Sequence, residues 1–308
     1  MRKESSMDES TTHFVAQLVE VSESEDLSSA EVRALAVKTI ESGNILFLPR
    51  AGFTLTRREQ ELVLDASVTL PTRKERESRN GRPTVLFDPD SSKILRSRIQ
   101  RPARDEFEAM MSRFSQWAET LVTQLLPNYA SALVRDRVTF RPCERGTPQG
   151  LHVDASYGHP TEGRGMLRVF CNINPTERPR VWHVGEGFEP FARRFLPTAS
   201  FRKTSRIEQW LASLGITKGR RTPYDKLMED IRGQVKGDDA YQANCPRKIV
   251  EFPAGSAWIV LTDLALHGAL SGQYSLDQTF FVPVTSMAEP DRSSLRILER
   301  LSGRQLVS

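Results

Sequence analysis

The chain has few cysteines and no long apolar run. Its 308 residues include only 3 Cys, at scattered positions, so the sequence indicates neither a disulfide framework nor a CxxC zinc site. We interpret the three thiols as reduced, partly buried side chains of a cytoplasmic protein. The best candidate for a membrane span, residues 257–270, is too short and contains an Asp and a His. The sequence therefore predicts no transmembrane helix.

A signal-peptide core and a strong charge of one sign are also missing. The first 12 residues are polar, and we expect them to be disordered. Lys and Arg outnumber Asp and Glu by only 43 to 39. This small excess does not indicate nucleic acid, and we expect no nucleic-acid partner. It is compatible with an anionic substrate or an anionic surface.

Residues 13–308 predict a single domain, whose first part, 13–136, supports the rest. It contains helical patterns over residues 27–44, 57–67 and 105–126, and a basic segment, residues 72–104, that we expect to form a long loop. Ser28 and Glu31 form the pattern of a capping box at the first helix, and Pro127 is expected to end the third.

Residues 137–284 have the pattern of a β-rich core. Seven short apolar runs are separated by Gly, Pro and Asn, which is typical of a sandwich or barrel. A segment with helical patterns, residues 187–244, interrupts these runs, and Thr222 and Pro223 indicate a helix start within it. Residues 285–308 end in a short amphipathic helix. We therefore predict an α+β protein: a double-stranded β-helix (jelly-roll or cupin-like) core with an N-terminal helical extension and a helical insertion.

The run GLHVDAS, residues 150–156, contains a possible metal motif. In an extended strand, residues i and i+2 point to the same face, so His152 and Asp154 would lie side by side. His267, which follows a buried apolar run, would complete the two-His, one-carboxylate triad of non-haem Fe(II) oxygenases. The alternative is that HxD occurs by chance and that the histidines are structural. The three other histidines are weaker candidates.

A metal held by three protein ligands has open positions for a bidentate oxoacid and O2. If the oxoacid is 2-oxoglutarate, its far carboxylate needs a fixed cation, and Arg binds it as a bidentate fork. The 16 residues after His267 contain no Arg or Lys. Arg168 is the first candidate, because a buried strand Arg is costly without an anion. An exposed edge-strand position for Arg168 is the alternative, and Arg141 is the rival candidate.

Three polar residues are further candidates for contact with the cosubstrate. Asn172 and Asn174 follow Arg168 on the same face of the strand, although both could equally be turn residues before Pro175. Gln278 lies where the last strand returns to the barrel.

Several motifs of the chain resemble the Kdo hydroxylase family. They are HVDA, GRGxLRVFxNxNPxxxPRVW, FxxxARRFLP and, near the end, HGALSGQxxLxQTFxxP. The similarity covers most of the chain from about residue 30 and is most specific from 137 to 284. HxD alone is a weak signal, whereas the four motifs together are specific.

The resemblance implies a dioxygenase that uses Fe(II), 2-oxoglutarate and O2. Its substrate would be Kdo (3-deoxy-D-manno-octulosonic acid) on a Kdo–lipid A acceptor of the Gram-negative lipopolysaccharide inner core, hydroxylated at carbon 3 to give Ko. It assigns the metal to His152, Asp154 and His267. Peripheral contact with the cytoplasmic face of the inner membrane would follow from such an acceptor.

A basic cluster in the insertion would suit this anionic acceptor. Arg202, Lys203 and Arg206 are the residues that we expect to bind its phosphates or carboxylates, although each could simply be a solvated surface charge. Two alternatives remain open. One is a related oxygenase acting on another sugar or lipid, and the other is a non-catalytic jelly-roll module that binds anionic glycolipid.

Overall fold

The computed structural model describes residues 15–22, 24–65, 84–96, 99–142, 148–155, 160–200 and 221–307. Within these ranges the strands form two sheets. The larger sheet contains, in spatial order, β1 (Leu18–Glu20), β2 (Ile45–Leu48), β9 (Ala257–Leu261), β6 (Gly165–Asn172), β11 (Ser275–Val282), β5 (Val134–Arg141), β3 (Val85–Asp88) and β4 (Lys93–Arg96). The smaller contains β10 (Ala265–Ser271), β7 (Arg180–Gly187) and β8 (Lys248–Phe252). These pairings are antiparallel except that of β1 with β2.

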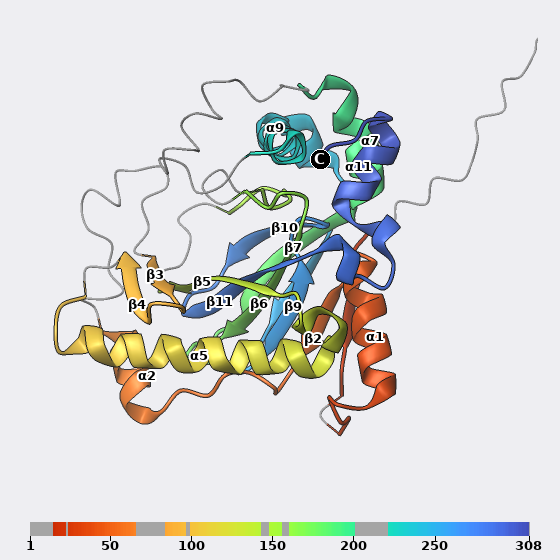
Figure 1. Cartoon of the computed structure of the whole chain (residues 1–308). Helices are drawn as coiled ribbons and strands as arrows, with labels where there is room; N and C mark the ends of the chain where they lie inside the picture. The colour runs from red at the N-terminus through yellow and green to blue at the C-terminus, as the bar shows by residue number, and fades with distance from the viewer. Residues whose placement is uncertain are drawn as a thin grey trace, which may run out of the picture.

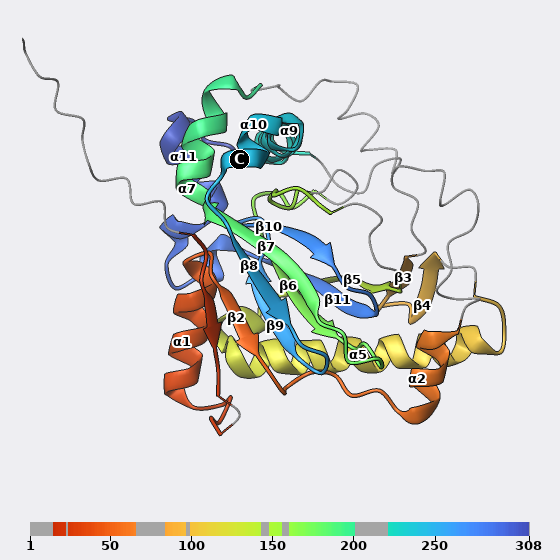
Figure 2. The ribbon, with the colours of Figure 1, turned by 180° about the vertical axis from the view of Figure 1, so that it is seen from behind.

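Helices lie on two sides of the sheets. They are α1 (Ala30–Glu41), α2 (Arg57–Leu64), α5 (Ala103–Leu125), α6 (Pro127–Ala130), α7 (Phe188–Phe195), α9 (Pro223–Gly237), α10 (Asp239–Asn244) and α11 (Ser294–Ser302), with 3-10 turns at Leu196–Thr198, Val284–Ser286 and Pro290–Arg292. Figures 1 and 2 show α5 along one side of the strands and α7, α9 and α11 together on the opposite side. None of the described helices has the length and apolarity needed to cross a membrane.

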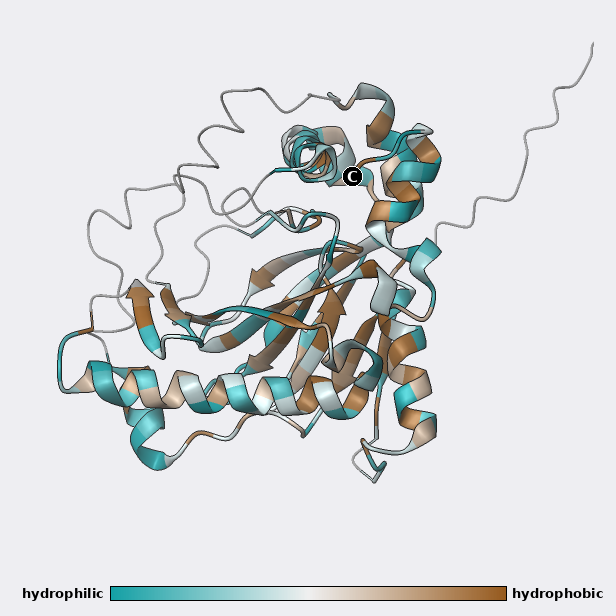
Figure 3. Ribbon diagram, in the orientation of Figure 1, coloured by the Kyte–Doolittle hydropathy of each residue, from teal (hydrophilic) through white to brown (hydrophobic). Residues whose placement is uncertain are grey.

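Apolar side chains concentrate in the central strands, as Figure 3 shows, while α5 alternates between apolar and polar residues along its length. The apolar face predicted for α5 is confirmed, because Phe107, Met110, Met111 and Phe114 are fully buried. A second cluster of buried residues is aromatic and joins the two sheets. In it Trp258 stacks on Phe252 with ring centroids 3.9 Å apart, and Trp182 meets Trp258 edge-on at 5.4 Å.

Helix starts follow the local chemistry of the chain. The predicted start of α9 is confirmed, since Thr222 and Asp225 form a capping box and Pro223 is the first helical residue. The predicted capping box at α1 is wrong by one residue. Ser28 bonds Asp26 instead, and the adjacent Ser29 accepts from the Val32 amide.

Two further sequence predictions are corrected by the structure. The segment 72–104 was expected to be a loop, but its described part contains the hairpin β3–β4, whose Phe87 and Ile94 are buried. Charged neighbours hide such short strands from pattern analysis. The run 150–156 is not a regular strand in its described part, since His152 forms only an isolated antiparallel bridge, with His267 of β10. The basic cluster Arg202, Lys203 and Arg206 and the first 12 residues lie outside the described residues.

Candidate metal centre

His152, Asp154 and His267 come together at the smaller sheet. One Asp154 oxygen lies 3.7 Å from His152 Nε2, and the other lies 3.9 Å from His267 Nε2. The three ligand atoms lie within 4.8 Å of one another. Two imidazole nitrogens and one carboxylate oxygen at such distances match the facial triad that holds non-haem Fe(II). The donor set and its spacing therefore fit an iron ion.

Backbone hydrogen bonds fix this convergence. The amide of His152 donates to the carbonyl of His267 at 3.0 Å, and the reverse bond has the same length. The Asp154 amide donates to the carbonyl of Thr262 at 2.8 Å. Because these bonds tie the motif to the β9–β10 region, ligands 113 positions apart in the sequence meet without a regular strand at the HxD segment.

Each histidine presents Nε2 to the centre for the same reason. His152 Nδ1 lies 2.9 Å from the carbonyl oxygen of Gly150, and His267 Nδ1 lies 2.9 Å from that of Ala265. A carbonyl oxygen only accepts, so Nδ1 carries the proton in both rings and Nε2 keeps its lone pair for a metal. The side-chain amide of Gln149 donates to His152 Nε2 at 2.8 Å.

The ionisation states of the three side chains also suit a metal. Burial lowers the pKa of His152 well below its ordinary value, and burial likewise lowers the pKa of His267. Burial alone would raise the pKa of Asp154, but the guanidinium of Arg168 and other nearby groups outweigh it and lower that pKa. The site therefore offers two neutral imidazoles and one carboxylate.

A pocket of about 180 Å³ opens beside the triad. Besides the three ligands and Gln149, its lining contains four arginines (Arg141, Arg168, Arg180 and Arg232) and Phe170, Trp182 and Ala269. Trp182 also stacks on the His267 ring, with centroids 5.1 Å apart. The pocket thus begins where the aromatic core between the two sheets ends.

Arg168 is the centre of a buried ion-pair network. Its Nη1 donates to Asp154 at 2.8 Å, and its Nη2 donates to Asp277. Arg141 donates to the second oxygen of Asp277 at 2.8 Å. Burial would raise the pKa of Asp277, but Arg141 and Arg168 lower it. The anion that the buried position of Arg168 was expected to need is thus already supplied in part by two carboxylates of the chain itself.

Several donors at the pocket remain without an acceptor. Among the described residues, Arg168 Nε, Arg232 Nε and Trp182 Nε1 are buried and have no hydrogen-bond partner. All three residues line the pocket. Buried donors without partners are costly, so the pocket is suited to a ligand rich in oxygen acceptors.

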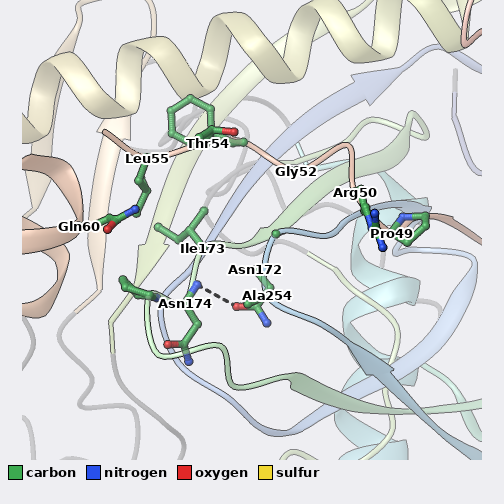
Figure 4. Close-up of a pocket in the computed structure, with 13 residues that line it drawn as sticks. Pro49, Arg50, Gly52, Thr54, Leu55, Gln60, Asn172, Ile173, Asn174 and Ala254 are labelled. Atoms are coloured by element: carbon green, nitrogen blue, oxygen red, sulfur yellow. Dashed lines mark hydrogen bonds between the residues drawn. The ribbon is translucent and has the colours of Figure 1, made fainter. Parts of the chain in front are cut away.

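Three predicted contacts lie elsewhere. Asn172 and Asn174 line a separate cavity of about 450 Å³ (Figure 4), and the Asn172 amide donates to the carbonyls of Arg178 and Phe252. Gln278 pairs with Val169 on β6, so it faces the side of the sheet opposite to Arg168. We therefore leave these three residues out of the cosubstrate site.

Sequence reasoning missed Gln149, Arg180, Trp182, Arg232 and Asp277. Arg180 and Trp182 belong to the PRVW part of a family motif, and this was the available signal for them. Arg180 is 5% exposed and donates to the carbonyl of Gly272 at 2.9 Å. His183, interpreted from the sequence as a weaker candidate, has a structural partner, because its Nε2 lies 2.7 Å from the carbonyl oxygen of Gln149.

Comparisons with known proteins agree with this geometry. The model of the family described as 3-deoxy-D-manno-oct-2-ulosonic acid (Kdo) hydroxylase matches residues 23–305. Among similar solved structures is the Kdo hydroxylase KdoO, described as a non-haem Fe(II) α-ketoglutarate-dependent dioxygenase, in complex with cobalt(II). It is 32% identical over 94% of this chain and 97% of that chain, with a TM-score of 0.83. Its complex with α-ketoglutarate and Fe(III) covers the same shares at 32% identity and a TM-score of 0.82.

The complex of KdoO with succinate and Fe(III) is 33% identical, covers 94% of this chain and 97% of that chain, and has a TM-score of 0.83. No curated protein sequence matches the chain. The family model extends over more than nine-tenths of the 308 residues. The chain belongs to the Kdo hydroxylase family.

Proposed function

We propose that this protein is an Fe(II)- and 2-oxoglutarate-dependent dioxygenase that hydroxylates Kdo. The observation that carries the proposal is the His152–Asp154–His267 centre, which faces a pocket whose buried free groups are hydrogen-bond donors. Iron held there would supply the activation of O2, with 2-oxoglutarate converted to succinate and CO2 as one oxygen atom enters the substrate.

The pocket donors would bind the cosubstrate. Arg168 is our proposed contact for a 2-oxoglutarate carboxylate, since its buried Nε retains a free donor, and Arg141 is the alternative. Trp182 Nε1 supplies a second donor from the smaller sheet. The role of the chain is thus to hold 2-oxoglutarate beside the metal centre and to keep Asp154 ionised next to it.

The chemical name of Kdo supports carbon 3 as the hydroxylated position. The acid group is carbon 1, the anomeric carbon is carbon 2, and the deoxy carbon 3 is the methylene beside it. We propose Kdo–lipid A as the acceptor and Ko as the product. The enzyme would then work at the cytoplasmic face of the inner membrane, in peripheral contact with it, and the basic cluster Arg202, Lys203 and Arg206 would bind the acceptor.

The fold that we propose for this activity is a double-stranded β-helix formed by the two sheets, which are antiparallel except for the β1–β2 pair, within one domain over residues 13–308. Its support is the layout in which strands of both sheets contribute to one pocket, with β6 supplying Arg168 and β7 and β10 supplying Trp182 and His267.

Mass spectrometry tests the function directly. Purified protein with Fe(II), 2-oxoglutarate and O2 should add one oxygen atom to the Kdo of Kdo–lipid A and release one succinate per turnover. Asp154→Asn, His152→Ala and His267→Ala should each reduce turnover by more than about 100-fold, because each removes a metal ligand. Glu251→Gln, the same carboxylate-to-amide change at an exposed position of β8, is the matched control and should remain active.

Two results would refute the proposal. Succinate formation without oxygen transfer to Kdo, but with transfer to another sugar or lipid, would indicate a related oxygenase. Binding of the glycolipid with neither product would indicate a non-catalytic module.

A further inference from the structure

Arg232 connects helix α9 with the metal centre. The helix is fixed by its buried side, which includes Ile231, and Arg232 reaches from it into the pocket lining. Its Nη1 donates to the carbonyl oxygen of Ala155 at 2.9 Å. Ala155 directly follows the metal ligand Asp154, so the guanidinium is held beside the reacting centre.

Arg232 also differs in charge balance from the arginines of the ion-pair network. Arg168 pairs with Asp154 and Asp277, and Arg141 shares Asp277. In the part of the chain that the structure describes, no carboxylate forms an ion pair with Arg232. Its Nε is buried and has no hydrogen-bond partner there. A guanidinium that is held in place and keeps a buried Nε donor without a partner is suited to bind a further anion.

The position of Arg232 separates it from the other free donors. Arg168 and Trp182 lie on strands β6 and β7 and belong to the walls formed by the sheets. Arg232 comes from α9, which lies with α7 and α11 on one side of the strands in both ribbon views (Figures 1 and 2). Arg168 and Trp182 therefore line the pocket from the sheets, whereas Arg232 lines it from a helix.

The acceptor sugar has an anion at the right distance from its reacting carbon. In Kdo the carboxyl carbon 1 and the hydroxylated carbon 3 are both bonded to carbon 2. Whatever binds that carboxylate must therefore lie next to the metal centre. We propose that Arg232 binds the carbon 1 carboxylate of the acceptor and thereby turns carbon 3 toward the metal. This inference rests on the function proposed above.

A cycle of two acceptors and two proteins tests it. The acceptors are Kdo–lipid A and its carbon 1 carboxamide, and the proteins are the wild type and Arg232→Gln. Wild-type kcat/KM should favour the carboxylate by on the order of 10- to 100-fold, as expected for a charge-assisted hydrogen bond. Arg232→Gln should lose that preference. The KM for 2-oxoglutarate and the uncoupled decay of 2-oxoglutarate should not change.

Direct binding provides a second readout. A short Kdo glycoside and its carboxamide are titrated calorimetrically into the anaerobic cobalt(II) protein. The affinity difference between them should be present in the wild type and absent in Arg232→Gln. Arg232→Lys keeps the charge but loses the planar guanidinium donors, so it should retain part of this affinity difference. Arg57→Gln makes the same Arg-to-Gln change at an exposed position of helix α2 and is the matched control, with the full preference expected.

The outcomes separate the inference from the function on which it rests. Equal weakening of both acceptors by Arg232→Gln, or a change in 2-oxoglutarate binding alone, would overturn the assignment and leave Arg232 as a support for Ala155 or a cosubstrate residue. If the wild type hydroxylated neither acceptor, the proposed function would fail, and the binding experiment would still decide whether Arg232 recognises the carboxylate.

Discussion

His152 and His267 obtain their ligand orientation from the same local device. In each, Nδ1 bonds the carbonyl oxygen two residues earlier in the chain, at Gly150 and at Ala265. The tautomer is thus determined within each segment, and only the convergence of the two Nε2 atoms needs long-range contacts. This arrangement prepares the centre before a metal binds, which reduces the reorganisation that binding requires.

The observed ion pairs of Arg168 and its proposed contact with 2-oxoglutarate can be separated by mutation. Arg168→Lys keeps a cation between Asp154 and Asp277 but loses the free Nε donor, so we expect 2-oxoglutarate affinity to fall while the fold and the metal affinity persist. Arg168→Ala should weaken the binding of 2-oxoglutarate further. It should also destabilise the protein, because two buried carboxylates lose their partner. The metal-to-ligand charge-transfer band of the anaerobic Fe(II) protein reports 2-oxoglutarate binding.

The rival residue provides the comparison. Arg141→Lys changes an arginine of the same pocket that also pairs with Asp277, and it should leave 2-oxoglutarate affinity nearly unchanged. If folded Arg168→Lys bound 2-oxoglutarate as tightly as the wild type and Arg141→Lys did not, the assignment would pass to Arg141.

At this scale the sequence revealed the local motif but not its partners. His152 and Asp154 are two residues apart, and His267 stands out because the chain has only 5 His. Asp277 was missed because its importance depends on the register of β11, in which it pairs with Phe170 on the pocket side. Arg232 was missed because its helix could not be placed over the pocket without tertiary structure.

Among the secondary-structure elements, the end of α1 depends on one buried carboxylate. Glu41 is 1% exposed and accepts hydrogen bonds from the Tyr129 hydroxyl at 2.7 Å and from the amides of Ala288 and Glu289. In Glu41→Gln an amide NH2 must face one of these donors. We expect a loss of about 1–3 kcal/mol in the free energy of unfolding, measured by urea titration. Tyr129→Phe, which removes one donor, should cost about 1 kcal/mol.

One outcome for Glu41→Gln would contradict this prediction. A Glu41→Gln protein as stable as the wild type would show that these bonds contribute nothing net to the packing of α1 against the C-terminal segment.

The pair of helices α7 and α11 carries an acid-sensitive contact. Glu189 on α7 accepts two hydrogen bonds from Arg300 on α11 and one from Arg193 on its own helix, and together the two arginines, Arg300 first, lower the pKa of Glu189 to about 2 from its ordinary value of 4.5. Because the pKa of Glu189 is lower in the folded than in the unfolded protein, the contact stabilises the folded state at pH values above about 4.5. This contribution to the free energy of unfolding is lost as the pH falls from about 4.5 to about 2. The side chains are 34% and 52% exposed, so the contribution should be at most about 1 kcal/mol.

Glu189→Gln should therefore lose stability at pH 7 and show a smaller decrease in its urea midpoint between pH 5 and pH 3 than the wild type. Parallel pH profiles for the two proteins would show that the contact does not stabilise the fold.

Element types were easier to predict than their edges and pairings. The long amphipathic α5 and the proline-started α9 follow from patterns within one segment. The hairpin β3–β4 was missed because four-residue strands acquire their stability from β5 next to them, which is a tertiary contact. The HxD segment has strand-like alternation, but in its described part it forms only an isolated β-bridge, at His152. The prediction that His152 and Asp154 lie close together is therefore correct, although the backbone that carries them is not a regular strand.

In the whole molecule, both sheets and helix α9 contribute side chains to the pocket. The sheets enclose a core rich in aromatic residues that ends at Trp182 and His267, and they supply Arg168 and Trp182, the donors that we propose for the cosubstrate. The helices between β7 and β8 include α9, which supplies Arg232 to the pocket lining. An acceptor that carries sugar carboxylates and lipid phosphates would contact this helical segment before it reaches the metal.

The basic cluster in that same segment should therefore influence the acceptor and not the iron. Neutralising Arg202, Lys203 and Arg206 together to Gln should raise the KM for Kdo–lipid A several-fold, and the effect should decrease at high salt if it arises from charge–charge attraction, which salt screens. The uncoupled decay of 2-oxoglutarate should be unchanged. The KM for a short Kdo glycoside without lipid phosphates should rise less than the KM for Kdo–lipid A. Equal loss of coupled and uncoupled activity would instead assign the cluster to folding, since a smaller amount of folded protein reduces both activities alike.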